Sequence, residues 1–283
     1  MPTLAAITLD PTGGGVALVA RLLWQVLRER HADATLRTMF DGPNHPATMP
    51  EKLAFGAALT SAQVLGRTDW VLFSHLGLAQ VQNALPAPVR RPYAVFLHGI
   101  EAWNDLGAAE RLALSRADLR FSNSRYTAQR VMTAHPGIGL VEPCPLALPP
   151  SDASAPRPVP MDGIGPHAVL VVGRMSASER YKGHDQLIDA WPQVVSAVPD
   201  AQLVMAGGGD DVPRLREKAA ASTAATAIRF TGYVDDAQLR GLYGQAAVFA
   251  LPSRGEGFGL VYLEAMAAGL PCIGSTDDAA VDV

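Results

Sequence analysis

Short apolar runs alternate with helical patterns along almost the whole chain, and this alternation constrains the fold more than any other feature. In the first part of the chain, the runs expected to form strands are 4–9, 34–39, 70–75, 93–98 and 119–124. Helical patterns lie between them, for example over 16–30 and 125–135. Strands that alternate with helices predict a parallel sheet with helices on both faces.

A segment dense in proline, serine and glycine interrupts this pattern at 145–166. No regular element tolerates so many prolines. After it the alternation resumes, with strands expected over 167–173, 201–207, 227–234, 247–253 and 270–275, and helices over 183–198, 212–222, 235–245 and 257–268. The sequence therefore predicts an α/β fold of two doubly wound domains, 1–150 and 167–283, joined by a proline-rich linker, 151–166.

We expect a ligand site in a cleft between the two domains, because such folds bind ligands beyond the carboxyl ends of their strands. The chain ends soon after the last expected strand, so we expect the second domain to be incomplete. The formal net charge of −4 gives no electrostatic reason to expect a nucleic acid partner.

Several absences from the sequence indicate a cytoplasmic location. No apolar run approaches the roughly 20 residues of a membrane helix, and the start lacks the pattern of a signal peptide. The two cysteines lie far apart, so neither a disulfide framework nor a zinc site is expected. There are three lysines, Lys52, Lys182 and Lys218, against 20 arginines, so each lysine is of interest.

A glycine turn at 13–15 follows the first expected strand and opens the first helix. Glycines at such a turn allow a phosphate or a sugar to approach the backbone amides of the helix start. A dinucleotide fingerprint is not complete, because Leu18 stands where its third glycine would fall. A tight turn without a ligand is the alternative interpretation.

His98 and Glu101 follow the strand expected at 93–98, so they are expected at its carboxyl end and directed toward the cleft. A histidine there can donate a hydrogen bond to a sugar hydroxyl or stabilise developing charge. The alternative is a histidine that only caps the strand end.

Two cations, Arg174 and Lys182, lie on the glycine-flanked loop that follows the next strand. A planar donor fork and a compact ammonium suit a diphosphate, although both could be solvated surface charges. Another glycine turn at 207–211 carries Asp210, which we expect to cap the following helix within a closely packed turn.

Glu256 and Glu264 stand eight residues apart, with a glycine-rich turn and a helix start between them. They could form an acid/base pair, bind a metal, or accept hydrogen bonds from a polyhydroxylated ligand. Metal binding is the weaker interpretation, because no histidine is near and no further acid completes a ligand set. The amides of Gly257, Phe258 and Gly259 are expected at the helix N-terminus, where anions bind. Glu264 is expected about two turns into the helix.

These motifs together resemble a known family. The stretches GR…KG, GGGDD, FTGYV and EGFGLVYLE followed by AAGLP resemble the retaining nucleotide-sugar glycosyltransferases of family 4, which have the GT-B fold of two Rossmann-like domains. The N-terminal stretches GGGVA, HGIEAW and SNSRYTAQRV resemble the acceptor-side half of bacterial members.

The resemblance implies a role for each candidate residue. Arg174 and Lys182 would hold the diphosphate of a UDP- or GDP-sugar, and Glu264 the ribose. The donor sugar would be held by Glu256 with the backbone of 257–259, and His98 would lie by its reacting face. The remaining implied contacts are Val234 for the base through its backbone, Gly14 and Gly15 for the donor or acceptor, and Glu101 on the acceptor side.

The implied reaction is the transfer of a hexose with retained anomeric configuration, without a required cofactor or metal. The acceptor would be a saccharide or a lipid-linked sugar in polysaccharide or glycoconjugate synthesis. An arginine-rich stretch, 110–130, could rest on the inner face of an anionic membrane, although such charges are usually a solvated face. The alternatives are a sugar phosphorylase, a nucleotide-sugar epimerase, or a binding module without catalysis.

Overall fold

A computed structural model describes residues 1–42, 45–148 and 157–283. The chain divides into two compact units, Met1–Leu146 and Ala147–Val283, each built on one parallel sheet. The predicted linker, 151–166, lies partly outside the described residues. Its described part packs on unit 2, where the amide of Val159 donates to the carbonyl of Ala237 over 2.9 Å. The cleft predicted between the two halves stays a prediction.

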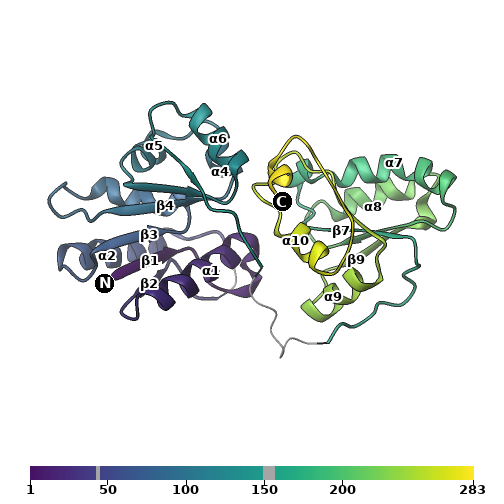
Figure 1. Ribbon diagram of the computed structural model, residues 1–283, viewed down its shortest axis with the longest axis horizontal. Helices are drawn as coiled ribbons and strands as arrows, with labels where there is room; N and C mark the ends of the chain where they lie inside the picture. The colour runs from purple at the N-terminus through teal and green to yellow at the C-terminus, as the bar shows by residue number, and fades with distance from the viewer. Residues whose placement is uncertain (43–44, 149–156) are drawn as a thin grey trace. The chain divides into compact units, whose positions relative to one another are not determined.

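Unit 1 is a six-stranded sheet in the order β2-β1-β3-β4-β5-β6 with helices packed against it (Figure 1). The strands are β1 (Pro2–Ala6), β2 (Thr35–Thr38), β3 (Trp70–Phe73), β4 (Tyr93–Leu97), β5 (Leu119–Ser122) and β6 (Glu142–Pro143). The α-helices are α1 (Gly14–Arg30), α2 (Met49–Val64), α3 (Leu76–Ala79), α4 (Ile100–Trp103), α5 (Ala108–Ser115) and α6 (Arg125–Ala134), and the 3-10 helices are η1 (Pro11–Gly13) and η2 (Gln80–Ala84).

Unit 2 is a five-stranded sheet in the order β11-β10-β7-β8-β9. Its strands are β7 (Ala168–Val172), β8 (Gln202–Ala206), β9 (Ile228–Gly232), β10 (Val248–Leu251) and β11 (Cys272–Gly274). Its helices are α7 (His184–Ala197), α8 (Val212–Ala220), α9 (Asp236–Gln245), α10 (Leu260–Ala267) and the 3-10 turns η3 (Ala177–Lys182), η4 (Ala225–Ala227) and η5 (Ala279–Asp282). Figure 1 shows α7 and α8 on one face of this sheet and α9 and α10 on the other.

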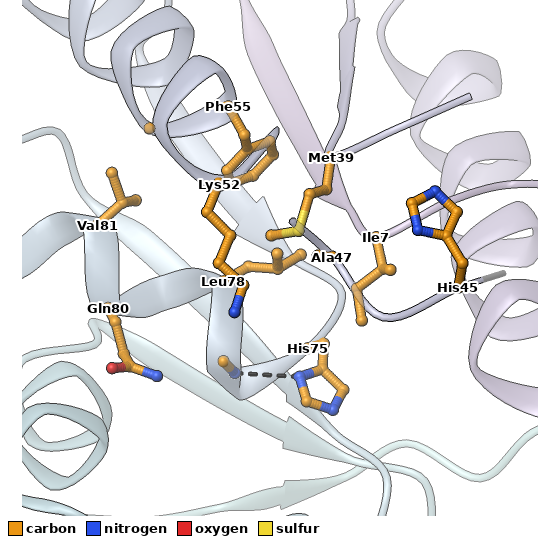
Figure 2. A pocket seen from close by; sticks show the side chains of 12 residues that line it. Ile7, Met39, His45, Ala47, Lys52, Phe55, His75, Leu78, Gln80 and Val81 are labelled. Atoms are coloured by element: carbon orange, nitrogen blue, oxygen red, sulfur yellow. Dashed lines mark hydrogen bonds between the residues drawn. The ribbon is translucent and has the colours of Figure 1, made fainter. Parts of the chain in front are cut away.

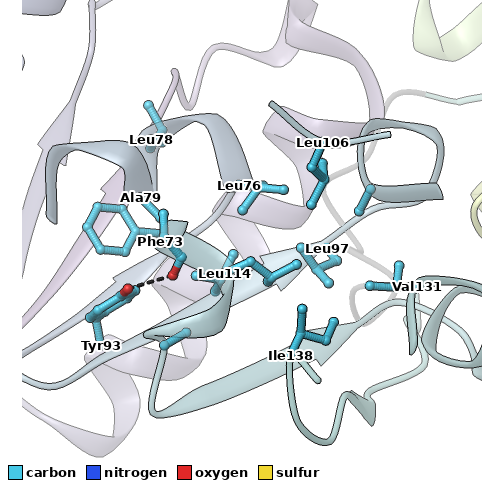
Figure 3. Packing of buried hydrophobic residues seen from close by; sticks show 14 of the residues in the cluster. Phe73, Leu76, Leu78, Ala79, Tyr93, Leu97, Leu106, Leu114, Val131 and Ile138 are labelled. Atoms are coloured by element: carbon cyan, nitrogen blue, oxygen red, sulfur yellow. Dashed lines mark hydrogen bonds between the residues drawn. The ribbon is translucent and has the colours of Figure 1, made fainter. Parts of the chain in front are cut away.

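Buried strands and the helices beside them form a separate core in each unit. In unit 1 the side chains of β3 and β4 pack against those of α5 and α6 (Figure 3). Four of these side chains are fully buried: Phe73, Leu97, Leu114 and Val131. The strands are apolar almost throughout because both faces of a parallel sheet are covered. This confirms the predicted α/β fold class with two doubly wound sheets.

One helix differs from its predicted bounds, and another was not predicted. The helix predicted over 257–268 begins only at Leu260, because Gly259 has a φ of +87° and a left-handed residue cannot continue a right-handed helix. Glu264 therefore lies about one turn into α10 instead of two. The helix that was not predicted is α2, which begins with a capping box between Thr48 and Glu51.

Candidate active site

The order of strands in unit 2 reverses between β7 and β10, and this is where an open α/β sheet usually binds its ligand. From β7 the chain moves to β8 and β9 on one side, and it then returns to place β10 on the other side. The segments that leave these two strands at their carboxyl ends are 173–183 and 252–256. They carry three of the predicted site residues, Arg174, Lys182 and Glu256.

These two segments are packed against each other. The amide of Arg254 donates to the carbonyl of Tyr181 over 2.9 Å. A Cβ at Gly255 would lie 2.5 Å from the ring of Tyr181, and a Cβ at Gly183 would lie 2.5 Å from the carbonyl oxygen of Pro252. Only glycine fits at both positions, so the glycines allow the close approach.

That approach brings together Lys182 and Glu256. The Lys182 ammonium donates to the Glu256 carboxylate over 2.5 Å, and the two side chains are only 16% and 14% exposed. Burial by itself lowers the pKa of Lys182, but the charge of Glu256 and its hydrogen bond outweigh this, so the pKa is raised. The site therefore holds a fixed positive charge beside a hydrogen-bond acceptor.

Arg174, the other predicted diphosphate contact, begins the same loop. Its guanidinium pairs with the carboxylate of Glu179 through two hydrogen bonds of 2.5 and 3.2 Å. The Arg174 side chain is 66% exposed. An exposed pair of this kind stabilises little and can be exchanged for another anion.

A buried carboxylate, Asp211, holds the loop 173–183 in place through hydrogen bonds. It accepts hydrogen bonds from Arg180 on η3 and from Arg214 on α8, and Arg214 also binds Asp185 on α7 through two bonds of 2.7 and 2.8 Å. The hydrogen bond from Arg214 lowers the pKa of Asp185 to about 2, and it also lowers the pKa of Asp211. This charged cluster ties the loop to two helices, and the sequence analysis missed it. The signal available was the run of charges Asp-Asp-x-x-Arg at 210–214.

The turn at 207–209 is closely packed, as predicted. A Cβ at Gly207 would lie 2.0 Å from the carbonyl oxygen of Gly173, and one at Gly209 would lie 2.1 Å from that of Met175. The predicted cap on α8 is wrong. Asp210 accepts instead from the amide of Ala177, at the start of η3, over 2.9 Å, because the turn directs its side chain toward that loop.

The turn that carries Glu256 is held by a second buried carboxylate, Asp278, which the sequence analysis also missed. Asp278 accepts from the amide of Glu256 over 3.0 Å and caps η5 through the amide of Ala280. An aspartate just before a helical turn is a usual cap signal. Burial raises the pKa of Asp278.

The residues between the two glutamates form the start of α10. Phe258 is buried, and Gly259 takes the left-handed conformation in which a Cβ would meet the ring of Tyr262 at 2.6 Å. Gly257 precedes them in the same turn. These three residues therefore lie at the helix N-terminus, as predicted.

Glu264 lies on α10 and accepts a hydrogen bond of 2.9 Å from the hydroxyl of Tyr243 on α9. Burial raises the pKa of Glu264, although the hydrogen bond from Tyr243 opposes this. Val234, predicted to meet the base, lies beyond the end of β9 with its side chain on the core of unit 2. Both residues stay candidates for the nucleoside.

Unit 1 carries the remaining predicted residues. The His98 Nε2 lies 2.6 Å from the carbonyl oxygen of Ser74, so in the neutral ring Nε2 holds the proton and Nδ1 is an acceptor. Glu101 turns back to accept from the amide of His98 over 2.5 Å. The ring of His98 stacks with that of His75, which the sequence analysis did not single out, at 5.9 Å between centroids. Both predicted side chains are therefore engaged within unit 1.

Gly14 and Gly15 form the first turn of α1, after β1. Both are exposed, and a Cβ on either would meet no atom within 4 Å. The turn therefore has the open space that the prediction of a ligand there requires. Across the described ranges of the chain, no three His, Cys, Asp or Glu side chains are grouped to hold a metal ion.

Residues 166–283 match the family model described as Glycosyl transferases group 1. The structure resembles that of the Anabaena protein Alr3699/HepE in complex with UDP and glucose, with a TM-score of 0.75 and 20% identity over 99% of this chain and 82% of that one. It also resembles sucrose-phosphate synthase from Thermosynechococcus elongatus, with a TM-score of 0.74 and 21% identity over 97% of this chain and 81% of that one. The two units are thus those of the GT-B fold.

Two curated proteins with similar sequences are mannosyltransferases. A GDP-mannose-dependent alpha-(1-6)-phosphatidylinositol monomannoside mannosyltransferase of Mycolicibacterium smegmatis is 34% identical over 62% of this chain and 50% of its own length. A phosphatidyl-myo-inositol mannosyltransferase of Mycobacterium tuberculosis is 43% identical over 39% of this chain and 28% of its own. This chain spans half or less of the length of these curated relatives. The part of the chain that matches the glycosyltransferase group 1 family model is its C-terminal part, residues 166–283.

Proposed function

We propose that this chain carries out the transfer of a hexose from a UDP- or GDP-sugar to a saccharide or lipid-linked acceptor, with retention of anomeric configuration. The observation that carries the proposal is the pair of Lys182 and Glu256 at the switch point of unit 2. It joins a cation for a diphosphate to an acceptor for sugar hydroxyls, in a domain that matches a glycosyltransferase family.

The positive charge of this site suits a departing nucleoside diphosphate. Lys182 and Arg174 would bind the diphosphate, and each would exchange its present carboxylate partner for a phosphate oxygen. Two such cations and the N-terminus of α10 stabilise the developing charge without a metal. We therefore propose that no metal or cofactor is required and that activity persists in EDTA.

The proposed acceptor can be soluble or lipid-linked. No helix within the described ranges has both the length and the apolarity needed to span a bilayer. We propose that the enzyme works at the cytoplasmic side, with the stretch 110–130 as the candidate contact for an anionic membrane.

Thermal shift against UDP, GDP, ADP and their sugars tests the donor site. We expect one nucleotide to raise the melting temperature at 1 mM, and we expect Lys182→Met to abolish most of that shift, because the diphosphate loses its buried cation. Lys218→Met is the matched control, since Lys218 pairs with Asp185 and Asp189 on α7, away from Glu256. No shift with any nucleotide, or an equal shift in Lys182→Met, contradicts the donor site.

Product analysis tests the reaction. NMR of the product from the stabilising donor is expected to show a glycosidic bond of the donor's anomeric configuration. An inverted bond contradicts retention, and release of sugar phosphate in the presence of inorganic phosphate identifies a phosphorylase instead.

A further inference from the structure

A cavity of about 640 Å³ lies in unit 1, at the carboxyl edge of its sheet (Figure 2). Ile7 follows β1, Met39 follows β2 and His75 follows β3, so the cavity lies where the strand order reverses between β1 and β3. This is the switch point of unit 1, the position at which open α/β sheets bind ligands. The volume falls within the range of about 300–1,000 Å³ that small-molecule sites occupy.

The lining of this cavity is apolar apart from a few basic or amide side chains. It consists of Ile7, Met39, His45, Ala47, Lys52, Phe55, Gly56, His75, Gly77, Leu78, Gln80 and Val81. No carboxylate is among these residues. The neighbouring acid, Glu51, is occupied, since it caps α2 through Thr48 and lies 3.4 Å from Nε2 of His45.

Lys52 differs from the two other lysines of the chain. Lys182 pairs with Glu256, and Lys218 pairs with two aspartates, but Lys52 forms no ion pair with any described residue. Figure 2 shows its side chain running from α2 toward the end of the cavity where His75 lies. The cavity therefore combines an apolar wall with one positive charge, on a solvent-exposed lysine that has no ion-pair partner among the described residues.

His75 adds a hydrogen-bond donor. Its Nδ1 accepts from the amide of Gly77 over 3.0 Å, so in the neutral ring Nε2 carries the proton. Burial lowers the pKa of His75, and the neighbouring ring of His98 acts in the same direction, whereas the charge of Glu101 opposes it. The ring is therefore neutral near pH 7, and Lys52 provides the charge.

We propose that this cavity binds an amphiphilic anion, with an apolar chain or ring between Phe55 and Leu78 and a phosphate or carboxylate group at Lys52. An unmodified saccharide fits less well, because its many hydroxyls would face a lining that is mostly apolar. Since His98 stacks on His75, the cavity adjoins the residue predicted beside the reacting sugar. The ligand is thus the anchoring end of the acceptor, an assignment that rests on the proposed function, whereas the binding itself does not.

Two variants test separately the contribution of the Lys52 charge and that of the cavity volume. Lys52→Met keeps most of the apolar stem and removes the ammonium. Gly56→Leu starts a side chain inside the cavity, where a Cβ would lie an ordinary 3.7 Å from Val81. Leucine also favours the helix interior over glycine, so this variant is expected to fold.

The experiment is calorimetric titration of the full chain with octyl phosphate below its aggregation threshold, with octyl glucoside and inorganic phosphate as matched probes. We expect octyl phosphate to bind at least about tenfold more tightly than either. Lys52→Met is expected to weaken octyl phosphate by roughly tenfold and leave octyl glucoside unchanged. Gly56→Leu is expected to abolish binding, and Lys218→Met to change nothing.

The proposal is overturned if wild type does not bind octyl phosphate, if octyl glucoside binds equally well, or if both cavity variants bind like wild type. The nucleotide thermal shift of Gly56→Leu, expected to equal that of wild type, separates this outcome from the donor site. If octyl phosphate binds as expected while no nucleotide does, the proposed function fails and the cavity site stands.

Discussion

The strand order reverses in the same way in both sheets, but the side chains at the two switch points differ in polarity and in ion pairing. In unit 2 the cations Arg174 and Lys182 are each paired with a carboxylate, in turns that are packed backbone to backbone. In unit 1 the corresponding edge has an apolar cavity, an open glycine turn, and a lysine that forms no ion pair within the part of the chain that the structure describes. A doubly wound sheet therefore determines where a ligand can bind, whereas the residues that follow the strands determine which ligand chemistry fits there.

The glycine turns should give the largest contrast between the units. We expect Gly207→Ala to destabilise unit 2 by about 4 kcal/mol, because the new methyl would lie 2.0 Å from the carbonyl oxygen of Gly173 at a φ of +136°. Gly15→Ala in unit 1 meets no atom within 4 Å and should be neutral or stabilise by about 0.5 kcal/mol. Urea unfolding followed by hydrogen exchange of peptides from each unit measures both effects.

An equal loss in both variants would remove this contrast. It would mean that the turn at 13–15 is as constrained as the turn at 207–209. A Gly207→Ala protein with unchanged exchange in β7 and β8 would show that this packing can relax at little cost.

The sequence predicted the alternation of elements well, because each strand and helix is encoded by a local apolar period. It also predicted that Lys182 and Glu256 share one site, since both follow the carboxyl ends of strands. Three features were not predictable in this way. The Asp211 cluster joins three separate elements, Asp278 reaches back across 22 residues to Glu256, and the cavity around Lys52 needs the relative placement of α2 and α3. Such contacts depend on tertiary packing, which no local pattern encodes.

The next prediction concerns pH. His184 follows Lys182 and is 3% exposed, and burial together with the Lys182 charge lowers its pKa to about 4 from its ordinary 6.5. Since the folded pKa is the lower one, the unfolded state binds the proton first as the pH falls. The stability that this provides is complete above pH 6.5 and is lost between pH 6.5 and 4, by about 3 kcal/mol.

Urea midpoints of wild type and His184→Gln across this window measure the effect. The wild type is expected to lose more stability than the variant as the pH falls, and hydrogen exchange should place the difference in α7. The lowered pKa of His75 in unit 1 gives both proteins the same additional dependence of stability on pH, so this contribution cancels when the two are compared. Parallel curves for the two proteins would exclude His184 as the titrating group.

The smallest contrast compares two tyrosine hydroxyls. Tyr243 in unit 2 donates to the carboxylate of Glu264 over 2.9 Å, whereas Tyr93 in unit 1 donates to the carbonyl of Ala113 over 2.5 Å. We expect each change to phenylalanine to cost about 1 kcal/mol at pH 7, measured by urea unfolding. The loss of stability at pH 7 therefore does not by itself distinguish the two hydrogen bonds.

The pH dependence of that loss distinguishes them. The folded pKa of Glu264 is raised above its ordinary 4.5, so its contribution favours the folded state below pH 4.5 and is lost as the pH rises through the folded pKa. Without the Tyr243 hydroxyl the folded pKa rises further, because the hydrogen bond to the ionised carboxylate is gone. Tyr243→Phe should therefore cost more at pH 7 than at pH 4.5, whereas Tyr93→Phe should cost the same at both, since a carbonyl does not titrate. Equal losses for Tyr243→Phe at the two pH values would mean that Glu264 is already neutral when folded, and then it could not serve as a charged acceptor for a ribose.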